Sequence, residues 1–106
     1  MKTIKLMPDY HCYPLWDMTP YKYCDLDPQK LPISRPLQIQ LMDWAKVYDE
    51  TLNIEYPVDS GFSSVDTKNA FEAEGARLAN RLRDELGPEL TVEVSINVFV
   101  KDSKDK

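Results

Sequence analysis

Strict alternation of apolar and polar residues marks the last part of the chain. From Leu90 to Val100 every second residue is leucine, valine or isoleucine, and the residues between them are polar except for Phe99. Because successive side chains of a strand point to opposite faces, this pattern predicts a long, half-buried strand over 90–100. Asn97 leaves open a bend between two shorter strands.

The first part of the chain predicts a short strand and then a long loop. Ile4 and Leu6 alternate with polar neighbours near 2–7, and a proline at position 8 ends the pattern. From that proline to Pro36 the chain holds six of its eight prolines and five aromatic residues, which excludes a long helix. We therefore expect a stiff loop over 8–34, pinned by its aromatic side chains and able to contain short strands.

A helix is predicted near 35–52. Ser34 can accept a hydrogen bond from the first turn, where the missing N–H of Pro36 is tolerated. The apolar residues that follow recur on one stripe of roughly 100°, which is typical of a helix that faces a core. Two more apolar residues, Ile39 and Met42, fall on the opposite side, so a second layer, a partner or a second copy must cover them.

A second helix is predicted near 66–86. Ser64 or Asp66 can cap its start, and a glycine and a proline at 87 and 88 end it. Gly75 lies within the apolar stripe of this helix. Because glycine has no side chain, another segment can approach the helix closely at that position.

The order of these elements is strand, loop, helix, helix, strand, followed by a frayed tail over 101–106. With 106 residues, this order predicts a single α+β domain in which two long helices pack on one face of a small β-sheet. The composition is too apolar for a disordered chain, and no apolar run is long enough to span a membrane. The N-terminus lacks a secretory signal, so we expect a cytoplasmic protein.

The acidic residues are concentrated in one segment. The chain carries a net charge of −5, and residues 36–66 hold one basic against six acidic residues. The flanking segments are nearly balanced, with five basic against four acidic residues in 1–35 and seven against eight in 67–106. Direct binding to nucleic acid is disfavoured, because phosphate recognition needs clustered lysine and arginine. The charge predicts either an acidic surface with a basic partner or a solvated helix face with its loop.

Catalytic and metal sites have little support in the sequence. Asp9, His11 and Cys12 suggest a nucleophile with a base, although neighbours in an extended segment point to opposite sides. A zinc site at His11, Cys12 and Cys24 lacks paired ligand spacing, and a Cys12–Cys24 disulfide is disfavoured in a reducing compartment. We expect no cofactor and no metal. The alternative is a small enzyme or ligand-binding domain centred on Asp9, His11 and Cys12.

Several strings of the sequence resemble a family of small bacterial proteins. They are KLMPDYHCYPLW at 5–16, LDPQKLPIS at 26–34, Trp44 with Tyr48-Asp49 and Thr51-Leu52-Asn53, Ser60-Gly61-Phe62, and FEAEG at 71–75 running to ELG at 85–87. Over about residues 5–92 the chain is similar to immunity proteins of contact-dependent growth inhibition and related polymorphic toxin systems. The resemblance implies a non-enzymatic protein that binds and blocks the toxic C-terminal domain of a cognate partner, often a nuclease. The strings are structural, so no residue's role carries over from them.

A partner of this kind places the acidic residues at a protein interface. A nuclease carries positive charge to hold its substrate, so an acidic inhibitor can occupy the same surface and associate rapidly. The first predicted surface is an acidic rim with two apolar contacts: Asp43, Asp49, Glu50, Glu55 and Asp59, with Ile39 and Met42. The second lies on the long loop and combines aromatic with acidic residues: Trp16, Tyr21, Tyr23, Asp25 and Asp27.

Overall fold

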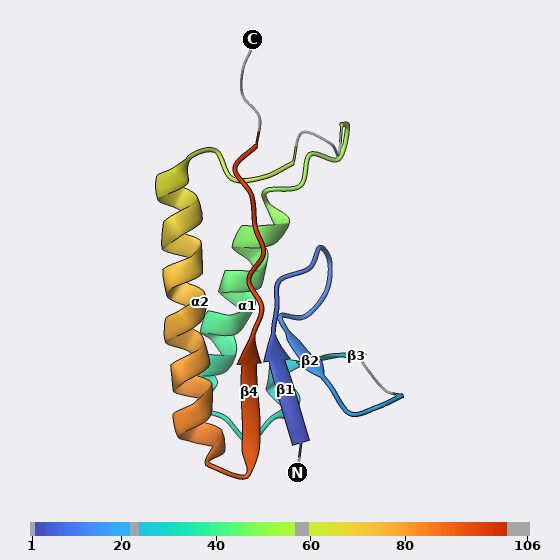
Figure 1. Ribbon diagram of the computed structural model, residues 1–106, viewed down its shortest axis with the longest axis vertical. Helices are drawn as coiled ribbons and strands as arrows, with labels where there is room; N and C mark the ends of the chain where they lie inside the picture. Colours follow the sequence, from blue (N-terminus) through green and yellow to red (C-terminus); the bar gives the residue numbers. More distant parts are fainter. Residues whose placement is uncertain (1, 22–23, 57–59, 102–106) are drawn as a thin grey trace.

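The computed structural model describes residues 2–21, 24–56 and 60–101, and it has the predicted α+β class (Figure 1). Its strands and helices are, in order, β1 (Lys2–Leu6), β2 (Leu15–Asp17), β3 (Cys24–Leu26), α1 (Arg35–Asp49), α2 (Val65–Leu86) and β4 (Leu90–Val94). A short 3-10 helix, η1 (Pro28–Lys30), precedes α1. Within the described residues, no helix is long and apolar enough to cross a membrane.

The four strands form one mixed sheet in the order β3-β2-β1-β4. β1 pairs antiparallel with β2 and parallel with β4, so Ile4 lies opposite both Asp17 and Val92. β2 in turn pairs antiparallel with β3. A parallel pair needs a long crossover between its strands, and here the crossover from β1 to β4 includes both helices.

The segment predicted as a loop over 8–34 contains more regular structure than a loop. β2, β3 and η1 all lie within it. Prolines forbid long elements, but each of these strands has three residues and contains no proline, so both fit between the proline positions. β2 carries Trp16, whose indole Nε1 donates a hydrogen bond to the Met7 carbonyl over 3.0 Å.

α1 ends at Asp49, three residues before the predicted end at 52. The hydroxyl and the backbone N–H of Thr51 both donate to the Tyr48 carbonyl, over 2.6 and 2.9 Å, and this tight turn takes the chain out of the helix. At the other end the Ser34 side chain accepts a hydrogen bond from the Leu37 N–H, as the sequence predicts.

α2 begins at Val65, one residue before the predicted start. Ser64 is its N-cap, and it forms a reciprocal capping box with Thr67. Gly87, with φ of 82°, ends the helix. A positive φ of this kind favours glycine, because the Cβ atom of any other residue would crowd the neighbouring backbone.

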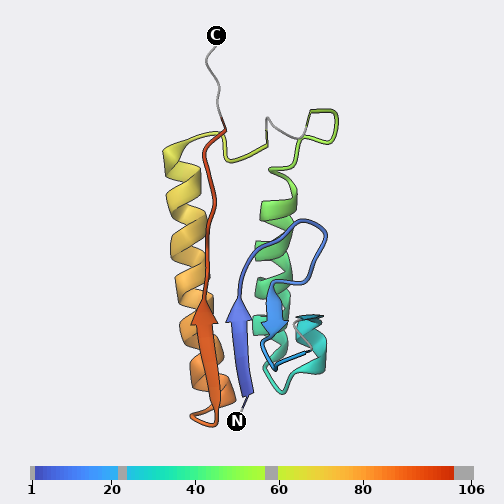
Figure 2. The same ribbon diagram turned by 45° about the vertical axis from the view of Figure 1, so that its right-hand side comes forward.

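The strand predicted over 90–100 is wrong in its second half. β4 ends at Val94 because its partner β1 ends at Leu6, and the Ser95 N–H already donates to the Leu6 carbonyl over 2.9 Å. The chain then runs on beside α2 toward the C-terminus (Figures 1 and 2) and forms an isolated bridge between Phe62 and Val100. The alternation correctly predicts that positions 92 and 98 are buried, but Val94 is 41% exposed.

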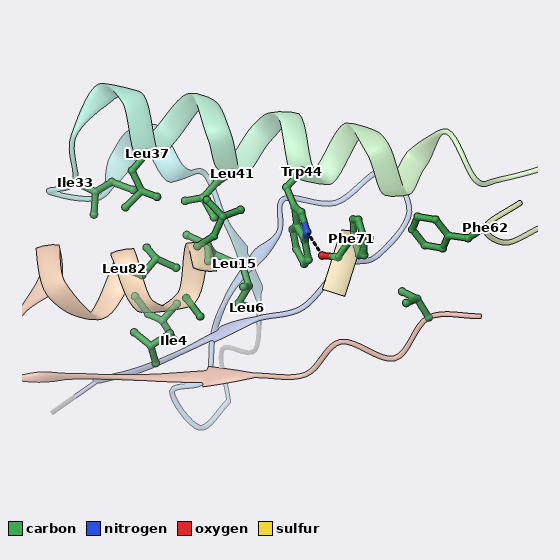
Figure 3. Close-up of a cluster of buried hydrophobic side chains, with 14 residues drawn as sticks. Ile4, Leu6, Leu15, Ile33, Leu37, Leu41, Trp44, Phe62, Phe71 and Leu82 are labelled. Atoms are coloured by element: carbon green, nitrogen blue, oxygen red, sulfur yellow. Dashed lines mark hydrogen bonds between the residues drawn. The ribbon is translucent and has the colours of Figure 1, made fainter. Parts of the chain in front are cut away.

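The hydrophobic core lies between the helices and the sheet (Figure 3). Leu37 and Leu41 of α1 meet Leu82 of α2 and strand residues at one end, where each leucine is fully buried. Burial of such a side chain contributes about 2 kcal/mol. At the other end the core becomes aromatic, with Trp44 and Phe71 lying between the helices. This aromatic end is next to the candidate site.

Candidate functional site

The outward face of α1 gathers four of the predicted partner-binding residues. Ile39 is 49% exposed, Asp43 and Glu50 are exposed, and Met42 is half-buried. They share one face because residues three, four and seven apart along a helix lie above one another. Asp43 lies at the centre of this face. A cleft flanks the face on each side, and Asp43 lines both clefts as well as a small hollow beside Ile39 and Met42.

One of these clefts lies between α1 and α2, and we call it the interhelix groove. Its volume is about 630 Å³. Its apolar lining comes from both helices and from the segment before α2: Trp44, Val47, Phe62, Ala70 and Phe71. Its acidic lining consists of Asp43, Glu50 and Glu74. The groove therefore combines an apolar floor with a negatively charged edge.

Aromatic packing holds the floor of the interhelix groove in place. The rings of Trp44 and Phe71 stack with centroids 4.4 Å apart, and Phe62 contacts Phe71 at 5.0 Å. The Trp44 Nε1 donates a hydrogen bond to the Phe71 carbonyl over 3.0 Å, which satisfies the polar atom of this buried ring. Gly75 makes the arrangement possible, because a Cβ atom there would lie 2.7 Å from Trp44 and would also collide with Ile96.

The second cleft lies on the other side of α1, against the segment 9–13, and we call it the loop-side cleft. Its volume is about 560 Å³. The carboxylate of Asp49 accepts a hydrogen bond from the His11 N–H, and that of Asp25 accepts one from the Tyr13 N–H, each over 2.9 Å. We call Asp25 and Asp49 the tethering carboxylates, because they fix the segment 9–13 to β3 and to the end of α1.

Tyrosine packing adds to this attachment. The rings of Tyr10 and Tyr48 stack at 4.4 Å, and the Tyr10 hydroxyl lies 2.9 Å from Thr51 Oγ1. Burial, followed by the neighbouring Tyr10, raises the pKa of Tyr48 to about 12, so this phenol stays neutral near pH 7. His11 adopts φ of 62° at the tip of the segment, a conformation that a non-glycine residue tolerates at a cost.

The constellation of Asp9, His11 and Cys12 is not arranged as a nucleophile with its base. The three residues are neighbours in space, but within the described residues no hydrogen bond joins the His11 ring to Asp9 or to the Cys12 thiol. Burial, followed by the charges of Asp9, Asp25 and Asp49, raises the pKa of the Cys12 thiol. A raised pKa disfavours the thiolate that nucleophilic catalysis requires.

The described cysteines and acidic groups form no metal site. Cys12 and Cys24 are both free thiols, so the disulfide considered above is not formed. Within residues 2–21, 24–56 and 60–101, no group of three or more histidine, cysteine or acidic residues is arranged to hold a metal ion.

The remaining predicted residues are divided between structural and exposed positions. Trp16 is half-buried and hydrogen-bonded to the backbone, and Asp27 caps η1 by accepting from the Gln29 N–H over 2.9 Å. Tyr21 is fully exposed, and Glu55 lies in the exposed turn after α1. Tyr23 and Asp59 are outside the described residues.

We call Asp43, Glu50 and Glu55 the outer carboxylates. Within the described residues, none of these three side chains takes part in a hydrogen bond or ion pair. This separates them from the tethering carboxylates, which the same run of acidic residues in the sequence does not distinguish.

The sequence did not predict the exposed residues that line the interhelix groove. Val47 is 44% exposed, and Ala70 and Glu74 of α2 lie across the groove from it. Ile54 and Tyr56, in the turn that carries Glu55, are 79% and 64% exposed. The sequence does not specify how α1 and α2 align along each other, so no local pattern predicts a groove that both helices form.

These features describe a small α+β domain with an exposed helix face between two clefts, a surface on which another macromolecule can dock. Comparison with known families is more specific: the model of the Serratia CdiI immunity protein-like family matches residues 2–96. The chain therefore belongs to that family of contact-dependent growth inhibition immunity proteins, which neutralise a toxin. A search of curated proteins gave no match.

Proposed function

We propose that this protein neutralises its cognate toxin in the cytoplasm by binding a basic, nuclease-type toxin domain through the outer carboxylates, without catalysis or a cofactor. The observation that carries the proposal is that Asp43, Glu50 and Glu55 have no internal partner within the described residues and share their surface with exposed apolar side chains. Three uncompensated carboxylates on one side favour a partner that brings its own positive charge.

Apolar residues on the same side support a protein partner over a solvated surface. Ile39 and Met42 lie beside Asp43 on the outward face of α1, and Ile54 and Tyr56 flank Glu55. An apolar centre with a charged rim is the usual composition of a protein interface. Asp59, outside the described residues, stays a predicted member of this surface on the sequence alone.

Co-expression tests the proposal directly. This chain is tagged and produced with the candidate toxin domain encoded by the gene immediately upstream, and growth, co-purification and affinity at low and high salt are measured. We expect restored growth and a stable complex whose affinity falls as salt rises, because salt screens attraction between exposed charges. Loss of growth without any complex would contradict the proposal.

A matched pair of variants tests the surface. Alanine at Asp43, Glu50 and Glu55 changes the net charge by the same amount as alanine at the exposed residues Asp84, Glu89 and Glu93, which lie in the last turn of α2, in the connection to β4 and on β4. We expect weaker binding and a smaller salt dependence for the first variant alone. Equal behaviour of the two variants would show that net charge, and not this surface, attracts the toxin.

A further inference from the structure

No side chain of the described residues fills the interhelix groove. Buried aromatic rings form its floor, while Val47 and Ala70 are exposed at its sides. Lys101 reaches its edge, but the five residues that follow in the sequence are aspartate, serine and lysine. These five residues therefore include no apolar side chain that would suit an apolar floor.

The charge at the groove indicates the sign of its occupant. Asp43 and Glu50 line one side without an internal partner in the described chain, and Glu74 lines the other, bound to Arg77 over 2.6 Å. Arg77 also donates to the Gln40 Oε1 over 3.1 Å, which joins α2 to α1 beside the groove. Among the described residues that line the groove, Lys101 is the one basic residue.

An occupant of the groove must bury apolar surface and leave each carboxylate either paired with a cation or hydrated. A purely apolar segment would cover Asp43 and Glu50 without compensation, which is costly. A segment with a lysine or arginine beside an apolar residue satisfies both conditions, since the apolar residue reaches the floor and the cation stays at the edge.

We propose that the interhelix groove receives a segment of the toxin in which a large apolar side chain lies next to lysine or arginine. This inference rests on the proposed function. It assigns the central contact of the interface to the floor formed by Trp44, Phe62 and Phe71, with the outer carboxylates Asp43 and Glu50 as its charged edge. An anchor in a desolvated pocket dominates the affinity of many protein complexes.

Two tryptophan substitutions on α2 test the assignment. Ala70 lines the groove, whereas Ala76 is an equally exposed alanine that does not. In Ala70→Trp the indole fills the groove, so we expect the Kd for the purified toxin domain to rise by about 30-fold or more, as for loss of a central anchor. In Ala76→Trp we expect a Kd within about twofold of the wild type, because an exposed substitution outside the interface is nearly neutral.

The outcomes separate the inference from the proposed function. Unchanged binding by Ala70→Trp, with a wild-type chain that binds and restores growth, would overturn the groove assignment alone. Failure of the wild-type chain to bind would overturn the proposed function and the inference with it. Thermal unfolding of both variants checks the fold, and Val47→Lys, which adds a cation at the edge of the groove, provides a second variant expected to weaken binding.

Photocrosslinking identifies the occupant. A benzoylphenylalanine at Val47 faces the groove in the complex with the toxin domain, and the crosslinked peptide is identified by mass spectrometry. We expect a toxin peptide in which lysine or arginine is adjacent to a large apolar residue. A crosslink to a second copy of this chain, or to an acidic toxin peptide, would overturn the inference.

Discussion

On the loop side of α1, Asp25 and Asp49 accept hydrogen bonds from the backbone N–H groups of Tyr13 and His11. On the outward face of α1, along the interhelix groove, the carboxylates of Asp43 and Glu50 accept no hydrogen bond from the described part of the chain. The same type of side chain therefore holds a loop in one region and stays available in the other. Acidic composition alone does not distinguish these two groups of carboxylates, whereas their hydrogen bonds do.

The two sides also differ in what lies beneath the charge. The loop-side cleft is lined mostly by polar side chains, together with Cys12, Met42 and Ala45, and tyrosine stacking attaches its outer wall to α1. The interhelix groove instead has buried aromatic rings of the core as its floor. A residue of that floor contributes to folding first, so substitutions there test stability more than binding.

The largest effect is expected for Trp44→Ala. Trp44 is 3% exposed, stacks on Phe71 and donates to its carbonyl, so its removal leaves a cavity and loses this hydrogen bond. We expect the free energy of unfolding to fall by about 3–5 kcal/mol, measured by urea denaturation. Trp16→Ala, which removes a half-buried side chain of β2, should cost less. An equal or smaller loss for Trp44→Ala would mean that the groove floor is not part of the core.

The next effect concerns the outer carboxylates. We expect Asp43→Ala with Glu50→Ala to raise the Kd for the toxin domain by about 10-fold to 100-fold and to reduce its salt dependence, because two charges at the edge of an anchor are lost. The free energy of unfolding should stay nearly constant, since these groups have no internal partner in the described chain. A loss of stability comparable with the loss of affinity would contradict the distinction between the two sides.

The opposite result is expected for the tethering carboxylates. In Asp25→Ala with Asp49→Ala, two backbone N–H groups lose charged acceptors, and we expect a loss of about 1–2 kcal/mol in the free energy of unfolding. Part of the loss is offset because Asp49 ends α1, where the helix dipole disfavours a carboxylate. The Kd for the toxin domain should change by less than about threefold. A large effect on Kd would extend the partner surface to the loop side.

Local patterns in the sequence predicted the elements that depend on neighbours along the chain. The stripes and caps of both helices and the start of β4 follow from spacing, Ser34, Ser64 and Gly87. The end of β4 could not be predicted, because it depends on where β1 ends, some 90 residues away in the chain. β2 and β3 are too short for alternation to be visible.

The candidate site was predictable only in part, for a similar reason. Ile39 and Met42 interrupt the polar pattern of an exposed helix face, so the sequence alone predicts them as contact residues. The sequence predicts Asp49 as a partner-binding residue, but no local signal shows that its carboxylate also accepts a hydrogen bond from the His11 N–H, 38 positions away. The interhelix groove likewise needs the register of α1 against α2, which Gly75 permits but does not specify.

The smallest effect concerns the thiol of the loop-side cleft, and it tests whether this side of the molecule carries a reactive site. Burial and the neighbouring carboxylates raise the pKa of Cys12, so a smaller fraction is thiolate at pH 8 than in an ordinary thiol. We expect iodoacetamide to modify exposed Cys24 before Cys12, with about tenfold slowing for each unit by which the pKa is raised. The difference should narrow as the pH rises, because more of Cys12 is then thiolate. The single variants Cys12→Ser and Cys24→Ser assign the two rates by mass spectrometry. Faster modification of Cys12 would restore the alternative centred on Asp9, His11 and Cys12, since it would reveal an activated nucleophile despite its acidic surroundings.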